Sequence, residues 1–405
     1  MMRTFLTAAA IAVVSSLLLS GNAFADGTTP ADITWTVANS AATGDQDNSA
    51  VATARTGYTA VVWEDDRDAD TPTDNVHSEV FLRLYKDGAS LYEKKLSTGG
   101  TGAWRHIQPD VALHEDGSAV VVWAEDPDAN GFYNIAVRAV NTAGTVTGST
   151  SANASADGQQ VAPAVAADPD GPGFAVVWED KQGTAAPTVR ASGFASITSK
   201  TYEAQVNTAG GTHQRPDVAV SAAGNAIVVW DEDGDANGSF NIGRKILTPA
   251  GGVKLAQGVA NATTAGQQRH ASVAANANGD FAVAWETDQS GASQVGARSF
   301  TATGTAAAEV IVPGVDPQVG IDDQRHVVVA WNEASDVYAQ GLNTDGTTTG
   351  RLPRLRVHTT VAGRQDEQAL AVSPFAQVVL AYTDDNDGNG FDQVYLGTGL
   401  TNSTW

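Results

Sequence analysis

Four acidic segments carry the clearest potential for chemistry in this sequence. In each of them, oxygen-bearing side chains stand at alternate positions in the pattern D-x-D-x-[DN], and glycine follows in three of the four. Calcium prefers oxygen ligands at such positions of a tightly turning loop. The candidate ligands are Asp66, Asp68 and Asp70; Asp126, Asp128 and Asn130; Asp233, Asp235 and Asn237; and Asp385, Asp387 and Asn389. The spacing therefore predicts calcium as a cofactor of these loops.

The same residue types also have a purely structural explanation. Asp, Asn and Gly are turn formers, so an acidic loop can be no more than a solvated turn. The spacing resembles the first half of an EF-hand loop, but no Glu stands at the twelfth position, where the EF-hand has its bidentate ligand. Further oxygen ligands could come from Asp74, Asn134 and Asn241. Calcium binding and turn formation both stay open on this pattern.

A second group of polar residues precedes several short apolar segments. It consists of Gln, Arg and His with one Trp, and we predict that it binds a ligand. Amides and guanidinium groups suit sugar hydroxyls, which need both donors and acceptors. The candidate ligand-binding residues are Trp104, Arg105, His106, Gln108, Gln214, Arg215, Gln268 and Arg269. Because they recur in register, the alternative is that they serve the repeat itself and cap strand ends.

A sevenfold repeat positions both groups. Its marker is an apolar run that ends in an aromatic residue and is usually followed by acids, at intervals of roughly fifty residues. The aromatic residues are Trp63, Trp123, Trp178, Trp230, Trp285, Trp331 and Tyr382. A short strand precedes each marker, a third strand follows it and usually carries Arg, and a fourth strand comes next. We expect these arginines, at positions 83, 138, 190, 244 and 298, to pair with the acids after each Trp.

Four short strands per unit and this period are typical of propeller blades. We predict an all-β, seven-bladed β-propeller with four antiparallel strands per blade over residues 26–405. The expected blades cover roughly 45–102, 103–158, 159–211, 212–266, 267–314, 315–363 and 364–405. The last copy lacks a fourth strand, and residues 33–37 form a spare strand before the first copy. Because closure removes free sheet edges, residues 33–37 should complete blade 7.

The N-terminus and the composition bound the cellular setting. Residues 1–25 have a short positive start, an apolar run and the site Ala23-Phe24-Ala25, which together predict a signal peptide and a secreted, extracellular protein. The absence of Cys excludes disulfides and thiolate metal sites. With 23 Lys+Arg against 46 Asp+Glu, the net charge of -23 argues against nucleic-acid partners. No later apolar run is long enough for membrane insertion.

The Trp-containing repeat and its acidic loops resemble those of secreted bacterial seven-bladed β-propellers with degenerate Trp-containing repeats. Lectin-like and integrin-like calcium-loop propellers belong to this group, and the resemblance covers the whole mature chain. It implies a propeller that binds a glycan or another cell-surface ligand. A targeting subunit of a larger assembly, with other secreted proteins as partners, fits the same resemblance. Many unrelated activities use this fold, so the resemblance specifies the fold more closely than the function.

Motifs for catalysis are absent from the sequence. The Asp-box of sialidases, S-x-D-x-G-x-T-W, is not present, and neither are G-x-S-x-G, H-E-x-x-H or a phosphate loop. The expected innermost strands are small and apolar apart from Asp110 and Asp217 near their ends. We therefore expect a non-catalytic recognition protein. The alternatives are an extracellular glycan hydrolase or lyase and a calcium-dependent structural scaffold.

Overall fold

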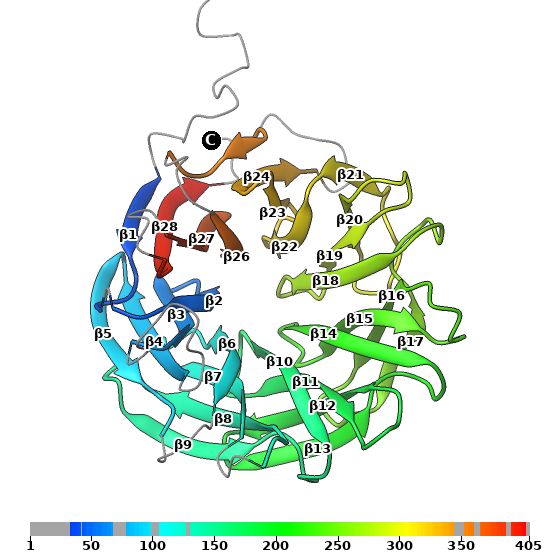
Figure 1. Ribbon diagram of the computed structural model, residues 1–405, viewed down its shortest axis with the longest axis horizontal. Helices are drawn as coiled ribbons and strands as arrows, with labels where there is room; N and C mark the ends of the chain where they lie inside the picture. The colour runs from blue at the N-terminus through cyan, green and yellow to red at the C-terminus, as the bar shows by residue number, and fades with distance from the viewer. Residues whose placement is uncertain are drawn as a thin grey trace, which may run out of the picture.

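The structure is a computed structural model that describes residues 33–41, 43–67, 78–98, 105–126, 130–343, 352–359, 365–385 and 390–401. The predicted signal peptide lies outside these residues. Within them, all regular structure is β-strand, arranged as seven sheets of four strands. No helix of the described residues is long and apolar enough to span a membrane. The sheets surround a central opening, with the first strand of each blade innermost (Figure 1), and the predicted β-propeller is confirmed.

The strands follow one another from the centre of each blade outward. Blade 1 contains β2 (Gln46–Thr53), β3 (Tyr58–Asp65), β4 (Glu79–Lys86) and β5 (Ala89–Lys95). Blade 2 contains β6 (His106–Leu113), β7 (Ala119–Glu125), β8 (Asn134–Val140) and β9 (Val146–Ser151). Blade 3 contains β10 (Gln159–Ala167), β11 (Phe174–Lys181), β12 (Thr188–Ser196) and β13 (Ser199–Gln205). Blade 4 contains β14 (Thr212–Val220), β15 (Ala226–Asp233), β16 (Asn241–Leu247) and β17 (Val253–Val259).

The remaining blades continue the same order. Blade 5 contains β18 (Gln268–Ala275), β19 (Phe281–Thr287), β20 (Gln294–Phe300) and β21 (Val310–Pro313). Blade 6 contains β22 (Val315–Ile321), β23 (Val327–Glu333), β24 (Asp336–Leu342) and β25 (Leu355–Arg356). Blade 7 contains β26 (Gln365–Val372), β27 (Gln377–Asp384) and β28 (Gln393–Thr401), and β1 (Thr34–Val37) completes it.

The N-terminal strand closes the ring. Strand β1 pairs antiparallel with β28, so that Thr34 stands opposite Thr398. In Figure 1 the blue β1 lies beside the red β28. The Trp35 ring packs edge-on against Tyr382, with 4.9 Å between ring centroids. The prediction that residues 33–37 supply the fourth strand of blade 7 is confirmed, and this pairing removes the free edge of β28.

The Val-rich second strand of each blade forms the core between blades. The Trp side chains that end these strands, at positions 63, 123, 178, 230, 285 and 331, are all 0% exposed. They pack against neighbouring sheets; Trp178, for example, shares a cluster with Val122 of the preceding blade. Full burial of one large apolar side chain stabilises a fold by about 1.5–3 kcal/mol. The repeated Trp is therefore part of the core and does not form a platform for sugar rings.

Acids that follow the Trp residues accept two kinds of hydrogen bond, one within a blade and one between neighbouring blades. The acid two residues after the Trp accepts the indole N–H, as between Trp63 and Asp65 at 2.9 Å. The acid directly after the Trp accepts a backbone N–H of the next blade: Glu64 accepts that of Gln108 at 2.6 Å, and Asp231 accepts that of His270 at 2.9 Å.

The expected pairing of strand arginines with these acids is wrong for most blades. Arg83 and Arg298 instead donate to the carbonyls of Ala38 and Ala260, at 2.6 and 3.1 Å, where the preceding blade ends. The reason is register: Arg83 stands opposite Val61, four residues before Asp65. At about 3.3 Å per residue this separation exceeds 10 Å, too far for an ion pair. Arg190 is the exception, because it approaches Asp180 to 3.9 Å.

Candidate active site at the channel mouth

A repeated backbone bulge shapes one mouth of the central channel. In every innermost strand the pairing with the second strand shifts near its start. A non-Gly residue with a left-handed backbone, φ between 48° and 56°, occupies each bulge: Asn48, Gln108, Ala162, Arg215, His270, Asp316 and Glu367. Such residues are uncommon in proteins, and bulges often re-aim side chains beside active sites. The seven bulges place a ring of backbone and side-chain groups at this mouth.

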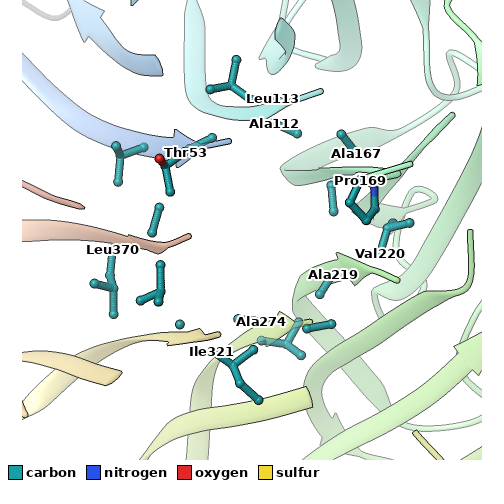
Figure 2. Close-up of a pocket in the computed structure, with 18 of the residues that line it drawn as sticks. Thr53, Ala112, Leu113, Ala167, Pro169, Ala219, Val220, Ala274, Ile321 and Leu370 are labelled. Carbon is teal, nitrogen blue, oxygen red and sulfur yellow. The ribbon is translucent and has the colours of Figure 1, made fainter. Parts of the chain in front are cut away.

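A polar cavity of about 600 Å³ lies within this ring. Six of the seven bulge residues line it, and only His270 does not. Further along the channel, small and apolar side chains such as Ala112 and Ile321 surround the opening in Figure 2. Asp110 and Asp217 also line this part of the channel. Both oxygens of each of these two acids accept backbone N–H groups, one from the acid's own blade and one from the next blade. The groups at the mouth are thus the better candidates for contact with a polar ligand.

Two carboxyl groups stand opposite each other in blade 1. Asp47 of β2 pairs with Glu64 of β3. Burial, together with the charges of Glu64 and Glu367, raises the pKa of Asp47 to about 9. Burial also raises the pKa of Glu64 to about 7. Because like charges directly opposite each other repel, this pair holds a proton near neutral pH.

Glu367 brings an ionisable carboxylate to the same part of the mouth. It lines the cavity, and its Oε2 accepts the backbone N–H of Asn48 at 2.7 Å, directly next to Asp47. A carboxyl group with a raised pKa and a second carboxyl group thus occur together, and general acid–base catalysis needs one group to donate a proton and another to accept one.

No other blade repeats the acid pair. At the equivalent positions Asp231 stands opposite Gln214, and Glu286 stands opposite Arg269. The remaining four pairs each contain at most one acid. The hydrogen bond of Glu64 to the next blade belongs to the repeat, whereas Asp47 has no such repeated role. The sequence alone does not single out Asp47, because only the strand register shows that it faces another acid.

Arg215 and Gln108 provide donors elsewhere in the cavity wall. The Arg215 side chain is 47% exposed, and its Nη1 lies 3.4 Å from Asp231 Oδ2. Burial raises the pKa of Asp231 to about 6. The Gln108 side-chain oxygen accepts the N–H of Ala162 at 2.9 Å, so its amide is fixed at the mouth. These two predicted ligand-binding residues line the cavity.

Two other predicted ligand-binding residues are buried and bonded within the fold. His106 lies with Nδ1 3.2 Å from the Ser78 carbonyl oxygen. Gln268 accepts the indole N–H of Trp285 at 2.9 Å. Their positions fit the alternative explanation, in which residues that recur in register stabilise the repeated blade and do not bind a ligand.

The remaining members of the predicted set are not gathered at one point. The Arg269 guanidinium lies over the Phe240 ring, 4.0 Å from its centroid. Gln214 is partly buried opposite Asp231, and Arg105 is partly buried just before β6. Trp104 lies outside the described residues.

A mixed cluster of possible metal ligands lies between blades 5 and 6 at the mouth. His270 Nδ1 is 3.0 Å from Glu286 Oε1 and 3.8 Å from Asp316 Oδ1. One ligand atom from each residue lies within 4.8 Å of the others. Glu286 also accepts the backbone N–H of Asp316 at 2.8 Å, which links the two blades and accounts for the closeness of this pair without an ion.

The acidic loops show turn-forming hydrogen bonds wherever they are described. In blade 4, the two oxygens of Asp233 accept the N–H groups of Asn237 and Gly238, at 3.0 and 3.1 Å. Asp126 accepts those of Asn130 and Gly131 in the same way.

The first acids of the other two loops also accept backbone N–H groups. Asp66 accepts that of Asp45, and Asp385 accepts that of Gly390 at 3.1 Å. Among the other predicted ligands, Asp235 is described and exposed, whereas Asp68, Asp70, Asp128, Asp387 and Asn389 lie outside the described residues. Turn formation thus explains the first Asp of each loop, while Asp235 and Asn237 still offer exposed oxygens.

Comparison with known proteins identifies the fold. The chain matches no protein-family model and no curated protein. Among solved structures it is similar to the polysaccharide lyase Uly1, with a TM-score of 0.58, 12% identity, and coverage of 90% of this chain and 91% of that one. It is also similar to a Dyadobacter fermentans protein of unknown function, with a TM-score of 0.51, 12% identity and coverage of 91% and 99%.

A third similar structure is the Trypanosoma rangeli sialidase in complex with 2,3-difluorosialic acid, described as a covalent intermediate. Its TM-score is 0.50 and its identity 8%, with 92% of this chain and 60% of that chain covered. At such low identities the likeness concerns the fold alone. These comparisons place the chain among the β-propellers, a fold that it shares with proteins named as glycan-acting enzymes.

Proposed function

We propose that this protein is a secreted, extracellular glycan hydrolase whose reaction takes place at the channel mouth. The observation that carries the proposal is the blade 1 carboxyl pair, Asp47 and Glu64, beside the carboxylate of Glu367 and a polar cavity. Glycosidases commonly use one protonated and one ionised carboxyl group on either side of the scissile bond. The names of two similar propellers, a polysaccharide lyase and a sialidase, support a glycan as the substrate.

Each group at the mouth has a distinct role in this reaction. Asp47, with its pKa raised by burial to about 9, remains protonated at neutral pH and donates a proton to the leaving oxygen. Glu367, which lines the cavity, acts as the base or the nucleophile. Arg215 and Gln108 hold substrate hydroxyl or carboxylate groups from elsewhere in the cavity wall.

A panel of polysaccharides, assayed for newly formed reducing ends, tests the proposal. Asp47→Asn should lower kcat about a hundredfold or more, the usual contribution of a general acid. Arg215→Ala should chiefly raise KM, because it removes a contact to the bound substrate. Asp87→Asn makes the same chemical change in an exposed turn and should leave both constants unchanged. Full activity in Asp47→Asn would contradict the assignment.

Non-catalytic glycan recognition is the second candidate. It is favoured by the hydrogen bond of Glu64 to Gln108, since this bond also occurs at equivalent positions of other blades and gives Glu64 a structural role. Retention of the protein on a glycan array, with neither reducing ends nor unsaturated sugar products, would select this function. Accumulation of unsaturated products would instead identify a lyase.

A further inference from the structure

The repeated Trp of blade 3 differs from those of the other blades in its hydrogen bonding. In blades 1, 2, 4 and 6 the indole N–H donates to the acid two residues later. In blade 5 the indole N–H of Trp285 donates to Gln268. The Nε1 atom of Trp178 is equally buried but has no hydrogen-bond partner. A buried donor without a partner costs about 1–3 kcal/mol, so this indole provides a free donor for a group that binds from outside.

The acid that should accept this indole N–H is occupied elsewhere. Asp180 stands two residues after Trp178, like the accepting acids of the other blades. Its Oδ1 accepts amide N–H groups from Gln160 at 3.0 Å and from Gln182 at 2.7 Å. Asp180 thus accepts from these two amides and not from the indole, and no other blade has this combination of side chains at the same three positions.

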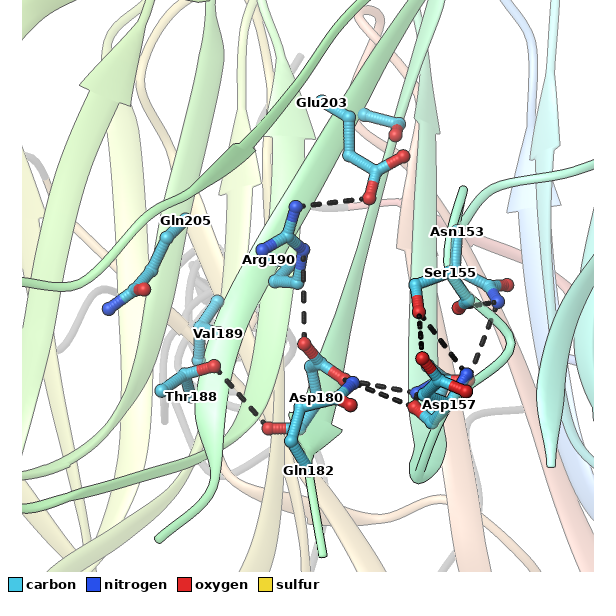
Figure 3. Close-up of polar contacts among 12 residues, drawn as sticks. Asn153, Ser155, Asp157, Asp180, Gln182, Thr188, Val189, Arg190, Glu203 and Gln205 are labelled. Atoms are coloured by element: carbon cyan, nitrogen blue, oxygen red, sulfur yellow. Dashed lines mark hydrogen bonds and ion pairs between the residues drawn. The ribbon is translucent and has the colours of Figure 1, made fainter. Parts of the chain in front are cut away.

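Arg190 is the second feature that is specific to blade 3. It stands directly opposite Trp178 on β12. The residues at the same position in the other Trp-containing blades are uncharged: Phe81, Ala136, Gly243, Gly296 and Tyr338. The guanidinium group of Arg190 lies between two carboxylates, 3.1 Å from Glu203 and 3.9 Å from Asp180 (Figure 3). A charged donor therefore lies on the face of the sheet that also carries the unpaired indole.

Trp178 and Arg190 both line a polar cavity of about 200 Å³. Asn153 and Ser155 line it from the connection between blades 2 and 3, opposite the Arg190 side in Figure 3. No residue of this cavity lines the channel mouth. It is thus a separate site on the molecule, and its ligand is independent of the reaction proposed for the mouth.

The charges around this cavity favour a neutral ligand. Glu203 accepts hydrogen bonds from both Arg190 and Lys200, at 3.1 Å each, so its charge is balanced. An anion would meet the carboxylates of Asp180 and Glu203. A cation would meet Arg190 and could not accept the Trp178 N–H. A hydroxyl group can accept from an indole or a guanidinium group and donate to a carboxylate at the same time.

We propose that the cavity of blade 3 is a saccharide-binding site that takes two neighbouring hydroxyl groups of a neutral sugar. One hydroxyl accepts the indole N–H of Trp178. The other accepts from Arg190 and donates to Glu203 or Asp180. The site binds sugar without transforming it, and it would hold a glycan chain at a place separate from the channel mouth.

Indole N–H resonances in ¹⁵N-labelled protein test this proposal directly. The Asp47→Asn protein is titrated with the methyl glycosides of glucose, galactose and mannose, so that turnover at the mouth plays no part. One indole resonance, assigned through Trp178→Phe, should shift with a saturable dependence on at least one glycoside. If Trp178→Phe does not fold, the same resonance is assigned from its displacement in Arg190→Lys.

Substitutions around the cavity, and a comparison of neutral with charged sugars, test whether the site binds a neutral sugar. Arg190→Ala and Glu203→Gln should each weaken the glycoside binding at least tenfold, whereas Arg138→Ala, which removes an arginine from the third strand of blade 2, should not change it. The proposal is overturned if no neutral glycoside moves the resonance, which would leave water as the occupant. It is equally overturned if glucuronate alone moves it, or if binding survives both variants. A failure here with intact polysaccharide turnover would leave the proposed hydrolase function standing.

Discussion

At the scale of single residues, the candidate sites stand out as departures from the repeat. The bulge and the acid after each Trp occur in most blades, so they are explained by the fold. Arg190 is not explained in this way, because the other Trp-containing blades have uncharged residues at its position. Asp47 is not explained in this way either, because it faces another acid, whereas its equivalent in blade 7, Asp366, faces Thr383. Each of them places an ionisable group where the repeat does not need one, and each lies beside a cavity or lines one.

The raised pKa of Asp47 predicts a pH-dependent cost to stability. Its folded-state pKa of about 9 lies above the ordinary value of 3.8, so the folded protein binds the proton more tightly than the unfolded chain. Proton binding by Asp47 therefore contributes fully to the stability of the folded protein below about pH 4. This contribution is lost as the pH rises towards about 9. Asp47→Asn cannot ionise and should therefore melt increasingly above the wild type as the pH rises.

Thermal melting over this pH range checks the prediction. The difference in melting temperature between Asp47→Asn and the wild type should be small near the acidic end and grow towards the alkaline end. Asp87→Asn, in an exposed turn, should show no such trend. A constant difference at every pH would mean that Asp47 is not buried beside like charges.

At the scale of secondary-structure elements, closure of the ring depends on a strand of four residues. β1 pairs with β28, and Trp35 packs against Tyr382 within the core cluster of blades 6 and 7. A short strand supplies few hydrogen bonds, so its side-chain packing must contribute much of its attachment. The first and last described strands thus depend on each other.

Truncation of Trp35 should therefore destabilise the whole protein. Because Trp35 is only partly buried, Trp35→Ala should cost about 2–3 kcal/mol, below the roughly 3–5 kcal/mol found for fully buried Trp residues. Trp35→Phe keeps an aromatic contact with Tyr382 and should cost less. Denaturant unfolding of both variants measures the difference. Equal stability of Trp35→Ala and the wild type would show that β1 is not needed for closure.

Calcium binding by the loops after the second strands remains a proposal, and blade 4 offers its sharpest test. The side chain of Asp235 accepts from Asn237 and makes no bond to the backbone of the turn. Calcium at a hundred times its Kd would stabilise the fold by about 2.7 kcal/mol per site. Added calcium should thus raise the melting temperature, a chelator should reverse this, and Asp235→Ala should reduce the response.

The exposed Asp170 provides the control for the calcium experiment, since Asp170→Ala removes an acid from a turn outside the predicted calcium loops. That variant should respond to calcium like the wild type. Melting curves that ignore both calcium and chelator would leave turn formation as the whole role of these acids.

At the scale of the whole molecule, stability rests on packing between blades and works against a large negative charge. The chain has no Cys and a net charge of -23. Seven apolar clusters lie between sheets around the ring. Repulsion among the negative charges opposes the compact state. Salt screens the charges and so weakens this repulsion.

Raising the salt concentration should therefore stabilise the protein. Between 0.01 M and 0.15 M ionic strength the Debye length falls from about 30 Å to about 8 Å, so that charges on separate blades no longer repel one another strongly. The melting temperature in sodium chloride with a chelator present should rise over this range. A fall would show that attractive ion pairs outweigh the net repulsion.

The fold could be predicted from the sequence because its determinants are periodic. Seven Trp or Tyr markers at similar intervals indicate seven sheets, and the unpaired segment around Trp35 indicates the closing strand. Alternation along a strand also shows which side chains share a face, since successive residues point to opposite sides. These signals lie within single strands, so they predict the strands correctly regardless of the residues in the neighbouring blades.

The candidate sites depended on tertiary structure, because they arise where separate strands meet. His106 and Gln268 are polar in the sequence yet buried in the fold. The pairing of Asp47 with Glu64, and of Arg190 with Trp178, follows from strand register, and a shift of one residue would send each side chain to the other face. The sequence by itself determined the blades and their order, whereas only the packed ring decided which polar groups meet and which of them stay open to a ligand.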